Sequence, residues 1–287
     1  MIKKKTTKES VQNAVKEVVN EDIVKKFNLN PHLFKPVHRI RVYVYIFLAF
    51  TIGVGSSFLF VIHESRYYIC TQIKQPSFLF NNKMLNKSSE LSVKNILDIK
   101  FKSEVDSSIT KYVSNTKGFN NSSYVPKNLE IIAGDYVIDV KGNSKLRTEA
   151  NRALQLMAAD FCKEFGERLT VVSAYRSFEY QSLLKSMGCN DSYCAKPGYS
   201  EHQTGLAVDL WEASTEVDFL SKKNYLKYFE WMNENAHNYG FHNTYQKGIE
   251  VDGYVVEPWH WRYVGLDLAK TLYENELTLS EYYKNLK

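Results

Sequence analysis

The sequence feature that most restricts the fold of this chain is a set of three residues, His202, Asp209 and His260. Two imidazoles and a carboxylate are the number and kind of donors that a catalytic Zn²⁺ takes from protein while it keeps a fourth position for water. His202 and Asp209 lie seven residues apart across a glycine-containing turn, and the apolar run 206–210 predicts a short strand there. The helical H-E-x-x-H arrangement is absent. The three donors would therefore come from a loop, a strand and a distant third segment.

Each of these residues also has a plainer interpretation. A lone histidine is often a polar residue with an ordinary hydrogen-bond partner, and the run Pro-Trp-His-Trp at 258–261 also fits an aromatic core around a buried imidazole. Glu257, three residues before His260, would act as proton acceptor for a metal-activated water only if the metal site exists. Taken singly, the residues leave both interpretations open.

Four pieces of sequence follow one another in a recognisable order: SAYRS at 173–177, then Gln181, then PGYSEHQTGLAVD at 197–209, then EPWHWRYVG at 257–265. Taken in order, they resemble the VanY-type D-alanyl-D-alanine carboxypeptidases and the related L,D-carboxypeptidases of bacterial cell walls. The run YVPKNL at 124–129 also resembles the entry segment of that family. Four linked blocks are more specific than any one of them. The resemblance covers about residues 121–270 and does not extend to the first 120.

The resemblance implies a zinc ion held by His202, Asp209 and His260, with Glu257 as the general base. A carboxylate beside a metal-activated water can take its proton and later pass that proton to the leaving amine. Glu201 adjoins His202 in the sequence and is a rival for the role of base. The alternative for Glu201 is a carboxylate that orients His202 or lies at the surface.

The resemblance also implies that Arg176, Gln181 and Ser200 bind the terminal D-alanine of the substrate. Arg176 follows a run of β-branched residues that predicts a strand, so it would stand at a strand end. A guanidinium offers a rigid two-donor fork to a free carboxylate. The alternatives are a structural ion pair for Arg176 and solvated loop positions for Gln181 and Ser200.

Residues 42–62 carry no charge and are long enough to cross the hydrocarbon core of a bilayer as one transmembrane helix. Residues 1–41 hold ten Lys and Arg against four Asp and Glu, which predicts that this basic segment stays in the cytoplasm. Residues 63–120, rich in Ser, Asn and Lys, are then expected as an extracytoplasmic stalk with weak helix, and 121–287 as the zinc carboxypeptidase domain. A cleaved signal peptide is the competing interpretation. The net charge of +5 comes from the cytoplasmic segment and gives no support for nucleic-acid binding.

Cysteine placement fits an exported domain. Cys189 and Cys194 flank a polar loop just before the candidate metal block, where a disulfide would pin the loop in an oxidising compartment. A zinc knuckle is the rival interpretation, but the loop lacks a second Cys/His pair nearby. Cys162 lies on the apolar face of a helical pattern and is expected as a buried thiol. The sequence leaves Cys70 as free, paired or acylated.

The pattern of elements predicts an α+β domain, in which a small antiparallel sheet is flanked by helices. The resemblance implies the same architecture, the small zinc fold shared with hedgehog-type domains, here preceded by one transmembrane helix. The expected elements are helices at about 145–165, 177–187 and 222–238, strands at 168–174 and 206–211, two strands around Tyr254 and Trp261, and C-terminal helices.

Together these features predict a membrane-anchored, zinc-dependent D-alanyl-D-alanine carboxypeptidase at the cell membrane. It would remove the terminal D-alanine from peptidoglycan stem peptides, with the catalytic domain outside. The alternatives are an L,D-carboxypeptidase, a D-Ala-D-Ala dipeptidase, or a catalytically silent protein that binds the cell wall. The expected partners are the stem peptide and the membrane, with no nucleic acid.

Overall fold

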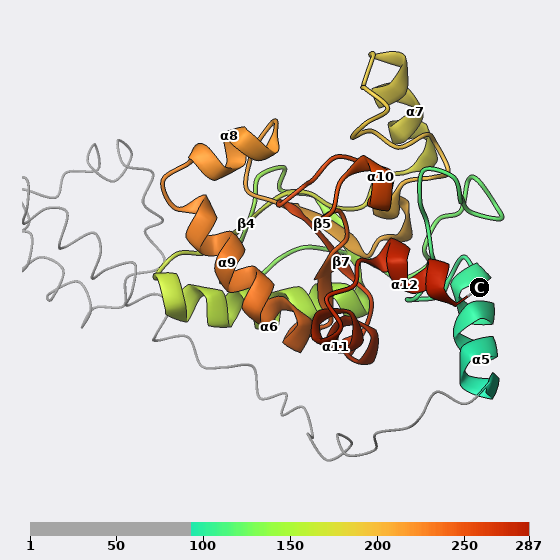
Figure 1. Cartoon of the computed structure of the whole chain (residues 1–287). Coiled ribbons are helices and arrows are strands. Elements are labelled where there is room, and N and C mark those ends of the chain that lie inside the picture. The colour runs from blue at the N-terminus through green and yellow to red at the C-terminus, as the bar shows by residue number, and fades with distance from the viewer. Residues whose placement is uncertain (1–92, 287) are drawn as a thin grey trace, which may run out of the picture. The chain divides into compact units, whose positions relative to one another are not determined.

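The computed structural model describes residues 93–286 (Figure 1). The predicted cytoplasmic segment 1–41, the predicted transmembrane helix 42–62 and the first part of the predicted stalk lie outside these residues. No helix among residues 93–286 has both the length and the apolar character that a membrane span needs.

A five-stranded sheet forms the centre of the described region, with the strand order β2-β4-β5-β7-β6. The pairs β4-β5, β5-β7 and β7-β6 are antiparallel, whereas β2 and β4 are parallel. The α+β class is therefore confirmed, but the prediction of a purely antiparallel sheet is wrong at this edge. The strands are β2 (Val137–Asp139), β4 (Leu169–Ser173), β5 (Ala207–Leu210), β6 (Phe241–Asn243) and β7 (His260–Tyr263).

The parallel pair has a simple physical origin. A parallel connection needs a crossover, and the helix α6 (Thr148–Phe165) supplies it between β2 and β4. A strand of three residues such as β2 leaves almost no periodic signal in a sequence. A second, two-stranded sheet pairs β1 (Leu129–Ile131) with β3 (Lys145–Arg147).

The helices predicted around 145–165, 177–187 and 222–238 and at the C-terminus are present. The strand predicted at Tyr254 is wrong, because Gly253 has a φ of +83° and ends the short helix before it in a turn. The strand that pairs with β7 on the side away from β5 is instead β6. The helices are α5 (Val93–Glu104), α6, α7 (Phe178–Ser186), α8 (Glu216–Ser221), α9 (Tyr225–Asn235), α10 (Ile249–Asp252), α11 (Leu266–Glu274) and α12 (Leu279–Asn285), with 3₁₀ turns η2 (Glu201–Thr204) and η3 (Ala236–Tyr239).

An aromatic core joins α6 to α9, which cross close together in Figure 1. The ring of Phe161 lies 5.1 Å from that of Tyr228, and the ring of Phe165 lies 4.9 Å from the same tyrosine. Trp211, directly after β5, stacks on Tyr228 at 5.2 Å. This cluster packs against the end of β5 and so fixes the position of the strand that carries Asp209.

Residues 105–120 are packed into the domain, although their composition predicts a stalk. The Arg262 guanidinium, fully buried on β7, donates to the carbonyl oxygens of Ile109 and Lys111 at 3.1 and 3.2 Å. The backbone N–H of Phe119 donates to Gly198 O at 2.9 Å. These backbone contacts attach residues 105–120 to the domain predicted at 121–287.

Two features of the cysteines stand out. Cys189 and Cys194 form the predicted disulfide, with their Cα atoms 5.8 Å apart. Cys162 is buried as predicted but is disulfide-bonded, so the prediction of a free thiol is wrong. Helical spacing predicts burial of a cysteine, but it does not indicate which distant sulfur comes within bonding distance.

Candidate metal centre

The fold brings His202, Asp209 and His260 together from three elements. His202 lies in η2, and Gly205, with a φ of +68°, reverses the chain directly into β5, where Asp209 stands. On the neighbouring strand β7, His260 is the register partner of Asp209. One donor atom from each residue lies within 4.8 Å of the others, and all three side chains are buried.

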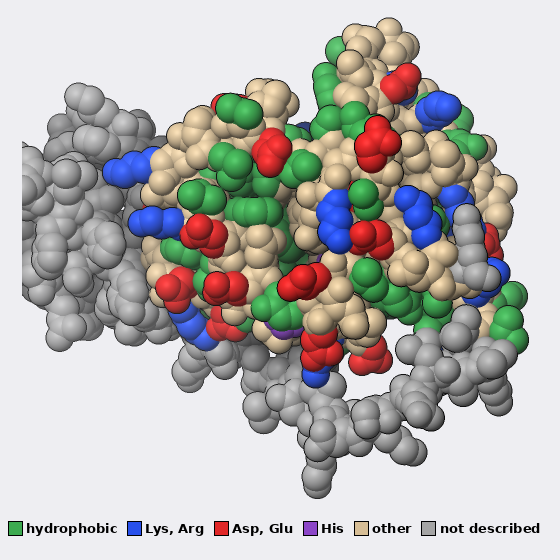
Figure 2. Space-filling model, viewed as in Figure 1, with side chains coloured by type: hydrophobic (Ala, Val, Ile, Leu, Met, Phe, Trp, Pro, Cys, Tyr) green, Lys and Arg blue, Asp and Glu red, His purple; other side chains and the backbone are tan. Residues whose placement is uncertain are grey.

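The donor atoms converge on Asp209 Oδ1. His202 Nε2 lies 3.2 Å from this oxygen and His260 Nδ1 lies 3.1 Å from it. His202 Nδ1 is 2.7 Å from the Ala174 carbonyl oxygen and can donate to it, which leaves Nε2 with a free lone pair. Figure 2 shows little histidine surface on the face it presents, in keeping with the burial of these rings. Two imidazole nitrogens and one carboxylate oxygen in a closed cluster fit a zinc ion.

The charge states suit this donor set. Burial lowers the pKa of His202 to about 4, and the nearby Arg176 acts in the same direction, so its imidazole is neutral at pH 7. Burial would raise the pKa of Asp209, but His202 and Arg176 hold it well below its ordinary value. The carboxylate is therefore ionised. A neutral imidazole and an ionised carboxylate are the forms that bind metal.

His260 differs, because two carboxylates act on it. Burial would lower its pKa, yet hydrogen bonds to Asp209 and Glu201 raise it to about 10. Without a metal, His260 is therefore protonated on both ring nitrogens, with Nδ1 facing Asp209 and Nε2 facing Glu201. A metal that binds at Nδ1 has to displace the proton on that nitrogen, so the metal affinity of this residue increases with pH.

Glu201 contacts His260, whereas the sequence had suggested His202. Its Oε2 lies 2.9 Å from His260 Nε2 and accepts from Thr244 Oγ1 at 2.9 Å. Arg262 NH1 lies 3.5 Å from the other oxygen, Oε1. Burial would raise the pKa of Glu201, but Arg262 and His260 outweigh it and keep the pKa below its ordinary value. Glu201 is thus an ionised carboxylate that orients a metal-binding imidazole, and this geometry does not suit the role of general base.

Thr244 and Arg262 were missed by sequence reasoning. Both support Glu201 in the interior: Thr244 directly follows β6, and Arg262 is on β7. The signal for Arg262 was present, because it directly follows the Trp-His-Trp block in the sequence. Thr244 had no such signal, since its role depends on the pairing of β6 with β7.

We expect Glu201→Gln to weaken zinc binding by roughly 10-fold to 100-fold, as removal of a carboxylate behind a ligating histidine does. The amide keeps the shape of the side chain but loses the charge that holds the His260 ring. Titration of the full-length protein against a competing chelator would measure the change. Glu164→Gln, an exposed change on α6, is the matched control and should leave zinc affinity unaltered. Equal affinities for the two variants would remove Glu201 from the metal centre.

Glu257 lies in the segment that leads into β7 and is buried. Its backbone is fixed at both ends, since its N–H donates to Tyr245 O at 3.0 Å and its carbonyl accepts from Asn243 Nδ2 at 2.9 Å. Burial raises the pKa of Glu257 to about 8, against the opposing effect of His260. A carboxyl group whose pKa lies close to neutrality is suited to accept and return a proton.

Arg176 stands just beyond β4, as predicted, and it contacts the candidate metal centre directly. Its NH2 donates to Asp209 Oδ2 and its Nε donates to Ser173 Oγ at 3.0 Å. The ion pair weighed as the alternative is therefore present. The side chain keeps 21 % of its surface exposed. Its role toward a substrate carboxylate stays a prediction.

Gln181 and Ser200 are buried, so the alternative of solvated loop positions is wrong for both. Gln181 Nε2 donates to Ala195 O at 2.8 Å, which ties α7 to the loop closed by the disulfide. Its Oε1 is buried and has no hydrogen-bond partner among the described residues. Ser200 directly precedes η2 and thus the first candidate ligand. The substrate-binding role of each stays a prediction.

Comparison with known proteins agrees with this site. Residues 143–266 match the family model VanY: D-alanyl-D-alanine carboxypeptidase. The YodJ protein of Bacillus subtilis (strain 168) is 36% identical over 174 residues, which are 58% of this chain and 63% of that protein. A D-alanyl-D-alanine carboxypeptidase of Enterococcus faecium is 33% identical over 163 residues, or 56% of this chain and 50% of that protein. The chain thus spans about half to just under two thirds of the length of these relatives.

Among solved structures, that of the LdcB LD-carboxypeptidase superposes with a TM-score of 0.53 at 32% identity, covering 63% of this chain and 88% of that one. The chain belongs to the VanY-type D-alanyl-D-alanine carboxypeptidase family. Every candidate site residue from Arg176 to His260 lies within the range that the family model matches. Residues 105–120 lie outside it, although they are packed against the same domain.

Proposed function

We propose that this chain is a zinc-dependent carboxypeptidase that removes the terminal D-alanine from peptidoglycan stem peptides. The observation that carries the proposal is the convergence of His202, Asp209 and His260, each buried, with Glu257 on the segment leading into the same strand. Membership of the VanY-type family supports the substrate class.

The chemistry follows from the residues around the centre. A zinc ion held by the three donors would lower the pKa of a bound water and polarise the scissile carbonyl. Glu257 in its ionised form takes the proton from the attacking water and returns it to the leaving amine. Its burial keeps its proton affinity high enough for that return. His202 and Asp209 stay in their metal-binding charge states throughout, because both pKa values lie well below neutrality.

Recognition of the peptide's end is assigned to Arg176. Only part of its guanidinium is engaged by Asp209 and Ser173, and the side chain is partly exposed. A free α-carboxylate could take the remaining donors in a charge-assisted contact. Such a contact would place the last peptide bond beside the metal centre and limit cleavage to the chain end.

An L,D-carboxypeptidase is the second candidate, because the LdcB LD-carboxypeptidase is similar over 88% of its chain. Both activities use the same hydrolytic chemistry and differ in the stereochemistry of the residue before the scissile bond. The metal-centre geometry does not distinguish them. The residues that contact the penultimate side chain would decide between the two.

Mass spectrometry of muropeptides incubated with the zinc-loaded full-length protein tests the proposal. Loss of one alanine from a pentapeptide supports the D,D-carboxypeptidase. Loss of one alanine from a tetrapeptide supports the L,D-carboxypeptidase, and release of a dipeptide supports a D-Ala-D-Ala dipeptidase. Unchanged muropeptides would point to a silent protein that binds the cell wall. The Glu257→Gln protein is the control in each incubation.

We also propose that residues 42–62 anchor the protein in the cell membrane, with residues 1–41 in the cytoplasm and the enzyme outside. The Cys189–Cys194 disulfide suits an oxidising compartment. A thiol reagent that cannot cross membranes is expected to label these two cysteines in intact cells only after reductant is added. Labelling without reductant would mean free thiols, and no labelling after reductant would place the domain inside.

A further inference from the structure

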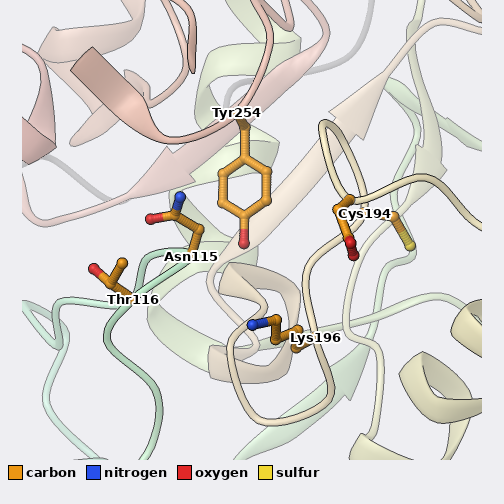
Figure 3. A pocket seen from close by; sticks show the side chains of 6 residues that line it. Asn115, Thr116, Cys194, Lys196 and Tyr254 are labelled. Carbon is orange, nitrogen blue, oxygen red and sulfur yellow. The ribbon is translucent and has the colours of Figure 1, made fainter. Parts of the chain in front are cut away.

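A pocket of about 280 Å³ lies outside the metal centre (Figure 3). It is bounded by residues 115–116, by the loop that the Cys189–Cys194 disulfide closes, and by Tyr254. The first of these walls belongs to the part of the domain that the family model does not match. The lining residues are Asn115, Thr116, Asp191, Cys194, Lys196 and Tyr254.

Two of the segments that line this pocket are connected to the candidate metal centre, one through ring contacts and both along the chain. The ring of Tyr254 lies 5.1 Å from that of Tyr245, and Tyr245 stacks on His260 at 4.7 Å. Along the chain, Tyr254 is three residues before Glu257, and Lys196 is four residues before Ser200. The two walls are also tied to each other, since Val255 N–H donates to Ser192 O at 2.9 Å. A peptide held at the metal centre could therefore extend into the pocket.

The pocket carries a positive charge that has no ion pair of its own. The Lys196 ammonium is exposed and, within residues 93–286, makes no side-chain hydrogen bond or ion pair; it acts on the Asp191 carboxylate only through a longer-range Coulombic attraction. The carboxylate in the lining, Asp191, is already paired with Lys185 on α7. In Figure 3 the Lys196 amine and the Tyr254 hydroxyl both point into the pocket. Burial raises the pKa of Tyr254, so its hydroxyl keeps its proton and can donate. A free ammonium and a phenol donor together suit a carboxylate ligand.

The separation from the metal centre indicates which part of a substrate would reach this pocket. An extended peptide advances about 3.4 Å per residue. Two successive ring contacts of 4.7 and 5.1 Å separate His260 from Tyr254. These contacts place Tyr254 within about three residues of His260. Because a carboxypeptidase releases a single residue, a peptide that reaches the pocket would do so with the part that it retains, two or three residues before the scissile bond.

We propose that this pocket is a subsite for a side-chain carboxylate on the residue two or three positions before the scissile bond, bound by Lys196 and Tyr254. The inference rests on the proposed peptidase function and adds a substrate preference to it. The enzyme would select peptides that are acidic at this position over those in which the acid is an amide. Arg176 would serve the terminal carboxylate separately, at the metal centre.

Four pentapeptides ending in D-Ala-D-Ala test the subsite. Two of them carry a side-chain acid, one at the second and one at the third residue before the scissile bond, and the other two carry the corresponding side-chain amide at the same positions. The zinc-loaded full-length protein should favour the acid over the amide in kcat/KM by about 10-fold at one of the two positions, the size of one partly exposed charge-assisted contact. Lys196→Met should abolish this preference, through KM more than kcat. Lys270→Met, an exposed lysine on α11, is the matched control and should keep the preference.

A binding measurement separates failure of the subsite from failure of the proposed function. The same four peptides are titrated by calorimetry into zinc-loaded Glu257→Gln protein, with and without Lys196→Met. Tighter binding of one acid, lost with Lys196→Met, supports the subsite even if the wild type hydrolyses none of the peptides. Equal affinities for acid and amide at both positions, or a preference that survives Lys196→Met, overturn it.

Discussion

Replacement of Glu257 by glutamine is expected to lower kcat by about 10³-fold while the protein keeps its zinc, within the 10²- to 10⁴-fold range typical of general acid–base catalysis. Glutamine has nearly the same size and keeps the backbone contacts to Tyr245 and Asn243, but it cannot accept a proton. Turnover of a D-Ala-D-Ala pentapeptide and the zinc content per chain are measured on the same preparation. Glu250→Gln, at an exposed position on α10, should change neither.

The pH profile gives a second view of the same residue. Below its pKa Glu257 is protonated and inactive as a base, so kcat/KM should fall as the pH is lowered through that pKa. The metal-free value is about 8, and a bound cation would shift it downward. Glu257→Gln should remove this acidic limb while zinc content stays constant. Near-normal rates in the variant would move the base elsewhere, and loss of zinc would show that Glu257 has a structural role.

The candidate metal centre could be predicted from the sequence because its residues lie in compact blocks. His202 and Asp209 are separated by one glycine turn, and the apolar run after it had the length of a strand. The adjacency of His260 came from the order of the blocks and is realised by the register of β5 with β7. The residues by themselves left the metal site open, and the resemblance of the linked blocks to a known family singled out the ligand set.

The supporting contacts could not be predicted, because they join residues that are distant in the chain. Glu201 adjoins His202 in sequence, but the 3₁₀ turn directs its carboxylate to His260, 59 residues away. Residues 105–120 resemble a linker in composition, yet Val113 and Phe119 are buried and two backbone oxygens of the segment accept from the buried Arg262. Contacts to backbone oxygens leave no side-chain pattern from which they could be predicted.

Arg176→Ala is expected to lower kcat/KM by about 10²-fold or more for a peptide with a free C-terminus, because a charge-assisted two-pronged contact contributes a few kcal/mol. Lysine should restore only part of the activity, since it keeps the charge and loses the fork. Arg176 also pairs with Asp209, so the variant's zinc content has to be measured alongside its kinetics. Loss of zinc would assign the effect to the metal centre.

A pair of substrates separates the two roles of Arg176. Amidation of the peptide's C-terminus should lower kcat/KM severely for the wild type and little further for Arg176→Ala, because the contact is already gone in the variant. Such non-additivity is the signature of a direct interaction between the two groups. A purely structural ion pair with Asp209 would instead give the same amidation effect in both proteins. If the wild type cleaved amidated and free peptides equally well, Arg176 would have only its structural ion pair with Asp209. The assignment as a carboxypeptidase would then be wrong.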